Sequence, residues 1–167
     1  DVKIIKEKLK SISDKGASII LYDSFKTEYI DDIQKAIELF QVEIECPLIS
    51  FISTKANKYS KPFTGMLEII ELFYKKEHKT INKSMSMVVG NKAGRITSKL
   101  RKIDRGCIDR AFAYNTGLNF VIPEKFFLDN NNVVLWEWNN QILCKSSREI
   151  YIENTKSFFL NNLTGLN

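Results

Sequence analysis

Short apolar segments alternate with amphipathic helical patterns from Val2 to Ile122, and this alternation restricts the folds open to the chain. Apolar residues recur at helical spacing over residues 2–14, 29–40, 66–76 and 104–117. Apolar runs of strand length cover residues 19–22, 48–52, 85–89 and 119–122. Strands that alternate with helices predict an α/β fold with a doubly wound, mostly parallel sheet and right-handed crossovers.

Polar turns follow the predicted strands. They are Ser60-Lys61-Pro62-Phe63-Thr64-Gly65-Met66, Val88-Val89-Gly90-Asn91-Lys92-Ala93-Gly94-Arg95 and Asp104-Arg105-Gly106-Cys107-Ile108-Asp109-Arg110-Ala111-Phe112-Ala113. Ligands of open α/β sheets bind beyond the carboxyl ends of the strands. Because Lys61 stands in the first of these turns, the sequence predicts a phosphate site there.

Composition fits one globular domain with its own core. The 167 residues are 44% hydrophobic and 27% charged. The run Asn130-Asn131-Asn132 divides the chain into a core of residues 1–129 and a tail of residues 130–167 with a different character. The net charge of +5 favours an anionic partner without requiring one.

Cysteine usage and hydropathy bear on the compartment. The three cysteines, Cys46, Cys107 and Cys144, are odd in number and lack zinc-ligand spacing. We therefore expect buried thiols in an intracellular, reducing compartment, with the cytoplasm, the nucleus and a virion not distinguished. No apolar run reaches transmembrane length and no signal segment is present, so no membrane partner is expected.

The polar turns also occur in the order found in a known family. Together with the closing Ile122-Pro123-Glu124-Lys125-Phe126-Phe127, they resemble the phosphatase domain of polynucleotide kinase/3′-phosphatase, in the haloacid dehalogenase superfamily. The resemblance runs from about Val2 to Phe127. It implies a Rossmann-like core and an ancestral Mg²⁺-dependent removal of phosphate from DNA 3′ ends.

Three positions of the family's site can be carried over to this chain. The lysine that holds phosphate corresponds to Lys61, where a point positive charge suits a transferring phosphoryl group. The threonine or serine that helps it corresponds to Asp23, or to Ser24 if the turn shifts by one residue. The carboxylate that holds the metal corresponds to Asn91, which brings no charge, so Mg²⁺ affinity should fall.

Two further acidic residues, Asp104 and Asp109, match acidic positions of the family's helix. A structural N-cap and a position on the helix surface explain them equally well. The sequence therefore leaves open whether either residue belongs to the site.

The resemblance places the family's nucleophile motif before the first matched helix. This sequence starts at Asp1 and leaves no room for the motif there, so we expect it elsewhere in the chain. The segment Val133-Val134-Leu135-Trp136-Glu137-Trp138-Asn139-Asn140-Gln141-Ile142 resembles that motif, with Glu137 and Asn139 at its two aspartate positions. The domain would then be circularly permuted, or the tail would begin a second, degenerate copy. The alternative is a simple extra strand with Trp136 and Trp138 on one face.

The chemistry implied by this motif is degenerate. Glu137 carries its carboxylate about one methylene too far, and a displacement on the order of 1 Å can reduce a rate roughly a hundredfold. Asn139 cannot transfer a proton, and only Glu137 would bring charge to a metal at Asn91. The sequence therefore predicts a pseudoenzyme without a cofactor, with Mg²⁺ needed only if activity is retained.

The sequence is compatible with three functions. The first is a non-catalytic module that binds nucleic acid or a protein. The second is an active Mg²⁺-dependent polynucleotide 3′-phosphatase in DNA repair, and the third is a structural subunit of a larger assembly. A basic cluster favours nucleic acid, although a solvated loop explains it equally well; it comprises Lys99, Arg101, Lys102 and Arg105.

Overall fold

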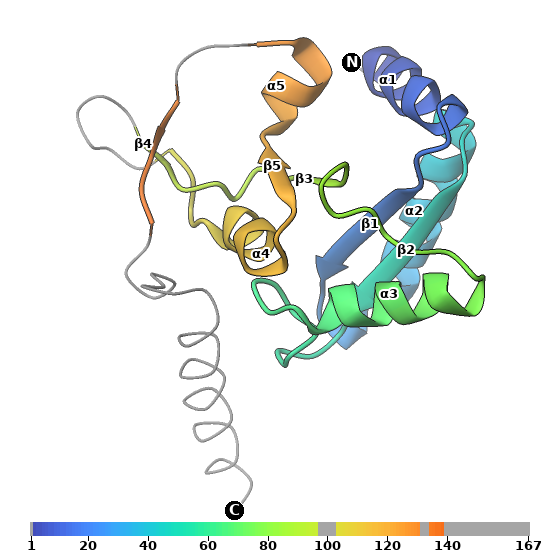
Figure 1. The fold of residues 1–167 in the computed structure, drawn as a ribbon, viewed down its shortest axis with the longest axis horizontal. Helices are drawn as coiled ribbons and strands as arrows, with labels where there is room; N and C mark the ends of the chain where they lie inside the picture. Colours follow the sequence, from blue (N-terminus) through green and yellow to red (C-terminus); the bar gives the residue numbers. More distant parts are fainter. Residues whose placement is uncertain (1, 97–102, 131–133, 139–167) are drawn as a thin grey trace, which may run out of the picture.

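The computed structural model describes residues 2–96, 103–130 and 134–138 (Figure 1). The helices are α1 (Val2–Asp14), α2 (Ile30–Ile44), α3 (Gly65–Lys76), α4 (Ile108–Thr116) and α5 (Pro123–Leu128), and a 3-10 helix covers Thr27–Tyr29. The strands are β1 (Ile19–Ser24), β2 (Leu48–Ser53), β3 (Met87–Val89), β4 (Arg95–Ile96), β5 (Asn119–Val121) and β6 (Leu135–Trp136).

The strands form pairs, two of which are parallel. β1 pairs with β2 from Ile19 opposite Leu48 to Ser24 opposite Ser53, and β3 pairs with β5. β4 and β6 form an antiparallel pair. The prediction of an α/β fold with parallel strands is therefore confirmed. Within the described residues, however, no strand pairing joins β1 to β3, so the single continuous sheet of the prediction is not formed there.

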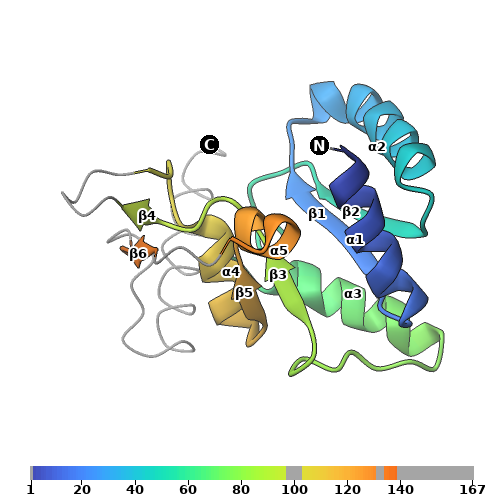
Figure 2. The same cartoon turned by 90° about the horizontal axis from the view of Figure 1, so that it is seen from above.

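Alternating side chains of β1 reach opposite faces of the β1–β2 pair, as the period of two in a strand requires. Ile19 packs against the cluster of Leu9, Ile44 and Cys46, which lies under α1 and α2. Ile20 packs against Met66 and its neighbours on α3. Figure 2 shows α2 on one side of the pair and α3 on the other.

The short helix α5 joins the two parallel pairs at one end. Phe126 and Phe127 pack against the Leu9 cluster, and Lys8 of α1 lies over the Phe126 ring. Pro123 opens this helix at its first turn, a position where the missing N–H has no consequence. The apolar pattern alone does not predict α5, although Pro123 followed by an acidic residue is a signal for the start of a helix.

Helix bounds differ from the prediction where side chains act outside the helix. The helix predicted over residues 104–117 begins at Ile108 instead. Asp104 is not helical because its carboxylate accepts hydrogen bonds from the N–H groups of Ala93 and Arg95. Gly117 ends the helix in the left-handed conformation, as a C-terminal glycine commonly does.

The tail strand does not lie where the nucleophile-motif hypothesis requires it. That hypothesis places residues 133–138 centrally, parallel to β1 and β3. Instead, β6 pairs antiparallel with β4, with Arg95 opposite Trp136, away from β1 in Figure 1. The central placement is therefore wrong for the described part of the tail, because the only ladder that β6 makes within the described residues is with the short edge strand β4.

None of the helices described by the structure has both the length and the apolar character needed to cross a bilayer.

Candidate functional site

Lys61 lies at the centre of a charged cluster between β1, the turn before α3, and α4. Its Nζ is 2.7 Å from Oδ1 of Asp109 and 3.4 Å from Oδ1 of Asp23. The Lys61 side chain is only 13% exposed, and its ammonium lies 5.3 Å from the centre of the Tyr22 ring. The predicted phosphate-binding lysine is thus held by two carboxylates from different parts of the chain.

Asp109 is the most constrained member of the cluster. It lies in the first turn of α4 and is buried, and its Oδ2 accepts the N–H of Lys92 at 3.0 Å. Gly90 packs directly against it, since a Cβ at position 90 would lie 2.5 Å from the Asp109 Cβ. The turn after β3 therefore needs glycine here so that the carboxylate can reach Lys61.

The Tyr22 ring packs beneath the Lys61 ammonium. Its hydroxyl donates a hydrogen bond to the Tyr59 carbonyl, and its ring lies 5.1 Å from the Phe112 ring of α4. Burial first, and then the charges of Asp23 and Asp109, raise the pKa of Tyr22 well above its ordinary value. The phenol is therefore protonated at neutral pH and acts as a hydrogen-bond donor, not as a base.

A second ion network supports the turn that leads from β3 to α4. The Arg95 guanidinium is 2.7 Å from Asp104 Oδ1 and 2.8 Å from Glu124 Oε1. Burial alone would raise the pKa of Asp104, but hydrogen bonds from the Arg95 side chain and from backbone N–H groups outweigh it, so the pKa is lowered. The Arg95 hydrogen bond also lowers the pKa of Glu124. Asp104 thus has the structural role that the sequence left open.

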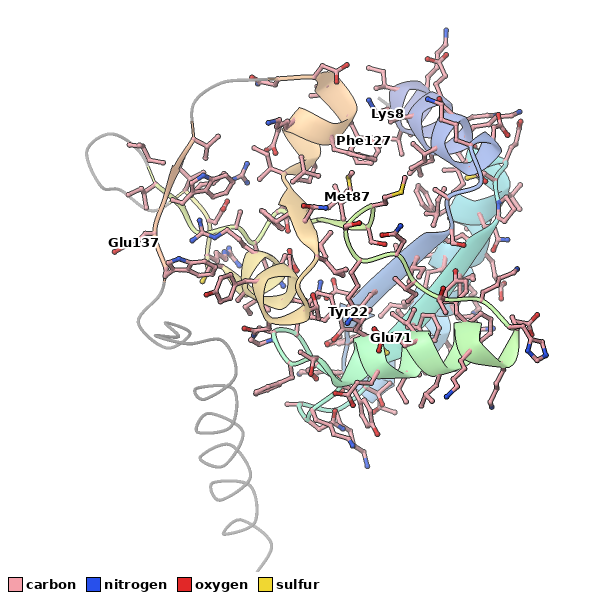
Figure 3. The ribbon with its side chains drawn as sticks, viewed as in Figure 1. Lys8, Tyr22, Glu71, Met87, Phe127 and Glu137 are labelled. Atoms are coloured by element: carbon pink, nitrogen blue, oxygen red, sulfur yellow. The ribbon has the colours of Figure 1, made fainter. Side chains whose placement is uncertain are left out.

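The structure brings few of the predicted site residues together. Ser24 is exposed, and its backbone N–H donates to Asp23, whose carboxylate is the group that faces Lys61. Asn91 is exposed, and its carbonyl accepts a hydrogen bond from Arg95 at 3.4 Å. Glu137 is exposed and lies far from Tyr22, and hence from Lys61, as Figure 3 shows.

Arg105 is exposed, but the rest of the predicted basic cluster lies outside the described residues. The same is true of Asn139, so its predicted place beside Glu137 stays a prediction. With β6 paired to β4, the structure gives Glu137 no contact with Lys61 or Asn91, because its backbone is held by Gly94 and Arg110 instead.

Sequence reasoning missed Asp109 as a partner of Lys61. A signal was available in the sequence. Two segments expected at the same edge of the sheet carry opposite charges, Lys61 in the first and Asp109 in the last. For Asp109, a position on the helix surface gave a sufficient local explanation and hid the longer-range one. That prediction was wrong, because the structure buries Asp109 against Lys61.

The donor set at this cluster does not fit Mg²⁺. Mg²⁺ requires near-octahedral oxygen coordination that includes one or two carboxylates. Here Asp23 and Asp109 both lie on the Lys61 ammonium, and Asn91 offers an uncharged amide. Within the described part of the chain, no group of three or more His, Cys, Asp or Glu side chains gathers closely enough to hold a metal ion.

Comparison with known proteins identifies the family. The family model "Polynucleotide kinase 3 phosphatase" matches residues 2–127, and the chain therefore belongs to this family. A bifunctional polynucleotide phosphatase/kinase of Schizosaccharomyces pombe is 28% identical over 131 residues, which are 75% of this chain and 30% of that protein. The polynucleotide 3′-phosphatase ZDP of Arabidopsis thaliana is 27% identical over 146 residues, 76% of this chain and 20% of that protein.

A viral relative is matched over a larger share of its own length. An uncharacterized 20.8 kDa protein of Autographa californica nuclear polyhedrosis virus is 30% identical over 125 residues, 71% of this chain and 66% of that protein. The chain spans less than a third of the yeast and plant relatives. This chain shares with those proteins its membership of the family.

Proposed function

We propose that this chain is a non-catalytic pseudo-phosphatase domain that binds nucleic acid. The observation that carries the proposal is the state of Lys61, whose charge is matched by Asp109 at 2.7 Å and by Asp23 at 3.4 Å. A lysine that must hold a transferring phosphoryl group acts through uncompensated positive charge. Here an incoming phosphate would meet two carboxylates around one ammonium.

Asp23 strengthens this argument because of the position it occupies. The resemblance places a phosphate-binding threonine or serine at Asp23 or Ser24, and it is Asp23 that faces Lys61. A hydroxyl donates a hydrogen bond to phosphate oxygens, whereas an ionised carboxylate only accepts and repels them. Together with Asn91 in place of a carboxylate, this substitution supports loss of the ancestral hydrolysis.

Nucleic acid is the partner we favour within this proposal. The chain carries a net charge of +5, and Arg105 is exposed at the end of the predicted basic cluster. Backbone phosphates supply most of the affinity in binding that ignores sequence, so a moderate basic excess is sufficient for weak association. The family's relatives are named for their action on polynucleotides.

A Rossmann-like, doubly wound core of the haloacid dehalogenase type is supported by the parallel pairs and by helices on both faces of β1–β2.

An active Mg²⁺-dependent 3′-phosphatase is the second candidate, favoured by the convergence of Lys61 and Asp109 from two family motifs. It would need acid, base and metal ligands from outside the described residues.

Phosphate release separates the two candidates. We expect the chain to release phosphate from a 3′-phosphorylated oligonucleotide with Mg²⁺ no faster than its Lys61→Ala variant, because the Lys61 charge is already neutralised. A colorimetric phosphate assay over a range of Mg²⁺ concentrations measures this. Lys58→Ala is the matched control, since Lys58 is an exposed lysine just before the same turn. Mg²⁺-dependent turnover that disappears in Lys61→Ala but not in Lys58→Ala would establish the enzyme instead.

Charge reversal tests the nucleic-acid partner. The double variant Arg101→Glu/Lys102→Glu should bind single-stranded DNA more weakly at low salt, and the slope of log affinity against log salt should fall by about one unit per lost phosphate contact. Fluorescence anisotropy of a labelled oligonucleotide gives both values. The reversal Lys75→Glu/Lys76→Glu at the end of α3 changes the net charge equally and serves as the control. Equal losses in the two double variants would mean that no local basic contact exists.

A further inference from the structure

A cluster of aromatic rings and one arginine lies where α4 meets β6. The Arg110 guanidinium carbon is 3.9 Å from the centre of the Trp138 ring and 5.0 Å from that of Trp136. The Tyr114 ring of α4 lies 5.6 Å from Trp138. We call these four residues the α4–β6 surface. Trp136 ends β6 and Trp138 follows two residues later, and both rings face the Arg110 guanidinium.

The α4–β6 surface is open to solvent. Trp136 is 43% exposed and Tyr114 is 51% exposed, although both carry large aromatic rings. Glu137, between the two tryptophans, projects to the opposite face of the strand, and Figure 3 shows it pointing away from α4. The accessible rings therefore surround a cation without a carboxylate among them.

Arg110 keeps an uncompensated charge on this surface. Its Nη2 donates a hydrogen bond to the Glu137 carbonyl at 3.0 Å, while its Nε, which is buried, has no hydrogen-bond partner among the described residues. No ion pair involves Arg110 within the same residues. An arginine stays protonated at all physiological pH values, so the tryptophan rings hold a full positive charge at the surface.

A ligand that matches this surface must offer both a flat ring and a negative charge. Exposed indole and phenol rings bind the π-faces of bases, and an arginine beside them binds phosphate. An apolar protein partner would cover the rings but would bury the Arg110 charge without a counterion, at a large free-energy cost. The chemistry of an unpaired nucleotide fits better than that of an apolar protein face.

We infer that the α4–β6 surface stacks an unpaired base of single-stranded nucleic acid on Trp136, with the Arg110 guanidinium against the neighbouring phosphate. This inference rests on the proposed nucleic-acid-binding function and gives it a location. Arg110 directly follows Asp109, so the first turn of α4 carries both the Lys61 contact and the stacking surface. A strand bound on this surface would thus run beside the Lys61 cluster.

The chain contains two tryptophans, and both belong to this surface, so intrinsic tryptophan fluorescence reports on it directly. We expect a single-stranded oligothymidylate to quench the emission of the full chain. An abasic oligonucleotide of the same length, which keeps the phosphates, should quench little and bind about tenfold more weakly. Trp136→Ala should lose about the same factor in affinity for the oligothymidylate, whereas Trp136→Phe should retain most of it.

The control variant is Tyr29→Ala, because Tyr29 is an aromatic residue of matched exposure, 51%, next to α2. Anisotropy of a labelled oligonucleotide, measured in parallel, separates the two hypotheses. Binding that is equal for the abasic strand and unaffected by Trp136→Ala overturns the stacking inference and leaves the proposed function standing. No binding at low salt overturns both. A shift of emission with protein concentration alone, without binding of the strand, identifies a contact between copies of the chain and also overturns the inference.

Discussion

Replacing Arg95 with leucine should lower the free energy of unfolding by about 3–5 kcal/mol, the range found when one partner of a buried ion pair is removed. The Arg95 side chain is 14% exposed and that of Asp104 is 6% exposed, so neither solvent nor salt compensates the carboxylate that remains. Glu124 loses its partner as well. Urea unfolding followed by circular dichroism measures the loss.

A surface pair provides the control for this variant. Lys83 and Glu71 approach to 2.9 Å, but both side chains are well exposed, so Lys83→Ala should leave stability unchanged within error. Adding Asp104→Asn to the Arg95→Leu variant should recover part of the loss, because it removes the stranded charge. A loss in Arg95→Leu no larger than that in Lys83→Ala would mean that the network does not support the fold.

The same network sets how stability depends on pH. The pKa of Asp104 is lower in the folded chain than in the unfolded chain, so its contribution is complete above the unfolded value, about 3.9, and disappears as pH falls through the lower folded value. The wild-type chain should therefore lose this stabilisation only in acid. In Arg95→Leu, the part of the acid dependence that comes from Asp104 should disappear or reverse.

Gly94→Ala should be the second most damaging change. Gly94 has a φ of +76°, which costs a residue with a side chain about 1–2 kcal/mol, and its new Cβ would overlap the Glu137 carbonyl and lie 2.9 Å from the Cys107 Cβ. Overpacking of this kind costs about 1–3 kcal/mol more. Because Gly94 accepts the N–H of Glu137, the β4–β6 pairing should be disturbed too. Thermal unfolding and tryptophan emission report the two effects.

Gly117→Ala separates strain from overlap. Gly117 has a similar φ of +71°, but nothing lies within 4 Å of the position that its Cβ would occupy. The Gly117→Ala variant should lose only the stability that the left-handed conformation costs, about 1–2 kcal/mol, and its tryptophan emission should match that of the wild type. Equal losses at positions 94 and 117 would show that the space beside Glu137 can accommodate a methyl group.

Local patterns predicted most of the elements. The helix over residues 2–14 was predicted with the bounds of α1, because a regular apolar face and a following Lys15-Gly16 define both ends. Bounds were less accurate where a side chain made a long-range contact. Asp104 is a residue type that commonly starts a helix, but its carboxylate binds Arg95 across the turn. No local sequence pattern predicts that contact.

Pairing was harder to predict than strand formation. The tail strand was recognised from its apolar and aromatic residues, yet these fit any available edge, and its partner β4 has only two residues. The candidate site shows the same limit. Lys61 was identified from its turn, whereas its partner Asp109, 48 residues further along, could be found only once the two turns were placed in space.

Side chains, not a backbone ladder, connect the two parallel pairs within the described residues. At one end α5 packs on α1 through apolar contacts, and at the other the links are Lys61 with Asp109, Tyr22 with Phe112, and Asn115 with the Pro62 carbonyl. Contacts of this kind permit rotation that a ladder of hydrogen bonds forbids. Lys61 with Asp109 is the ion pair among these three links, so a change of charge at either residue acts directly on the junction between the two pairs. The relative placement of the two parallel pairs therefore depends on a few side chains, of which Lys61 and Asp109 are the charged ones.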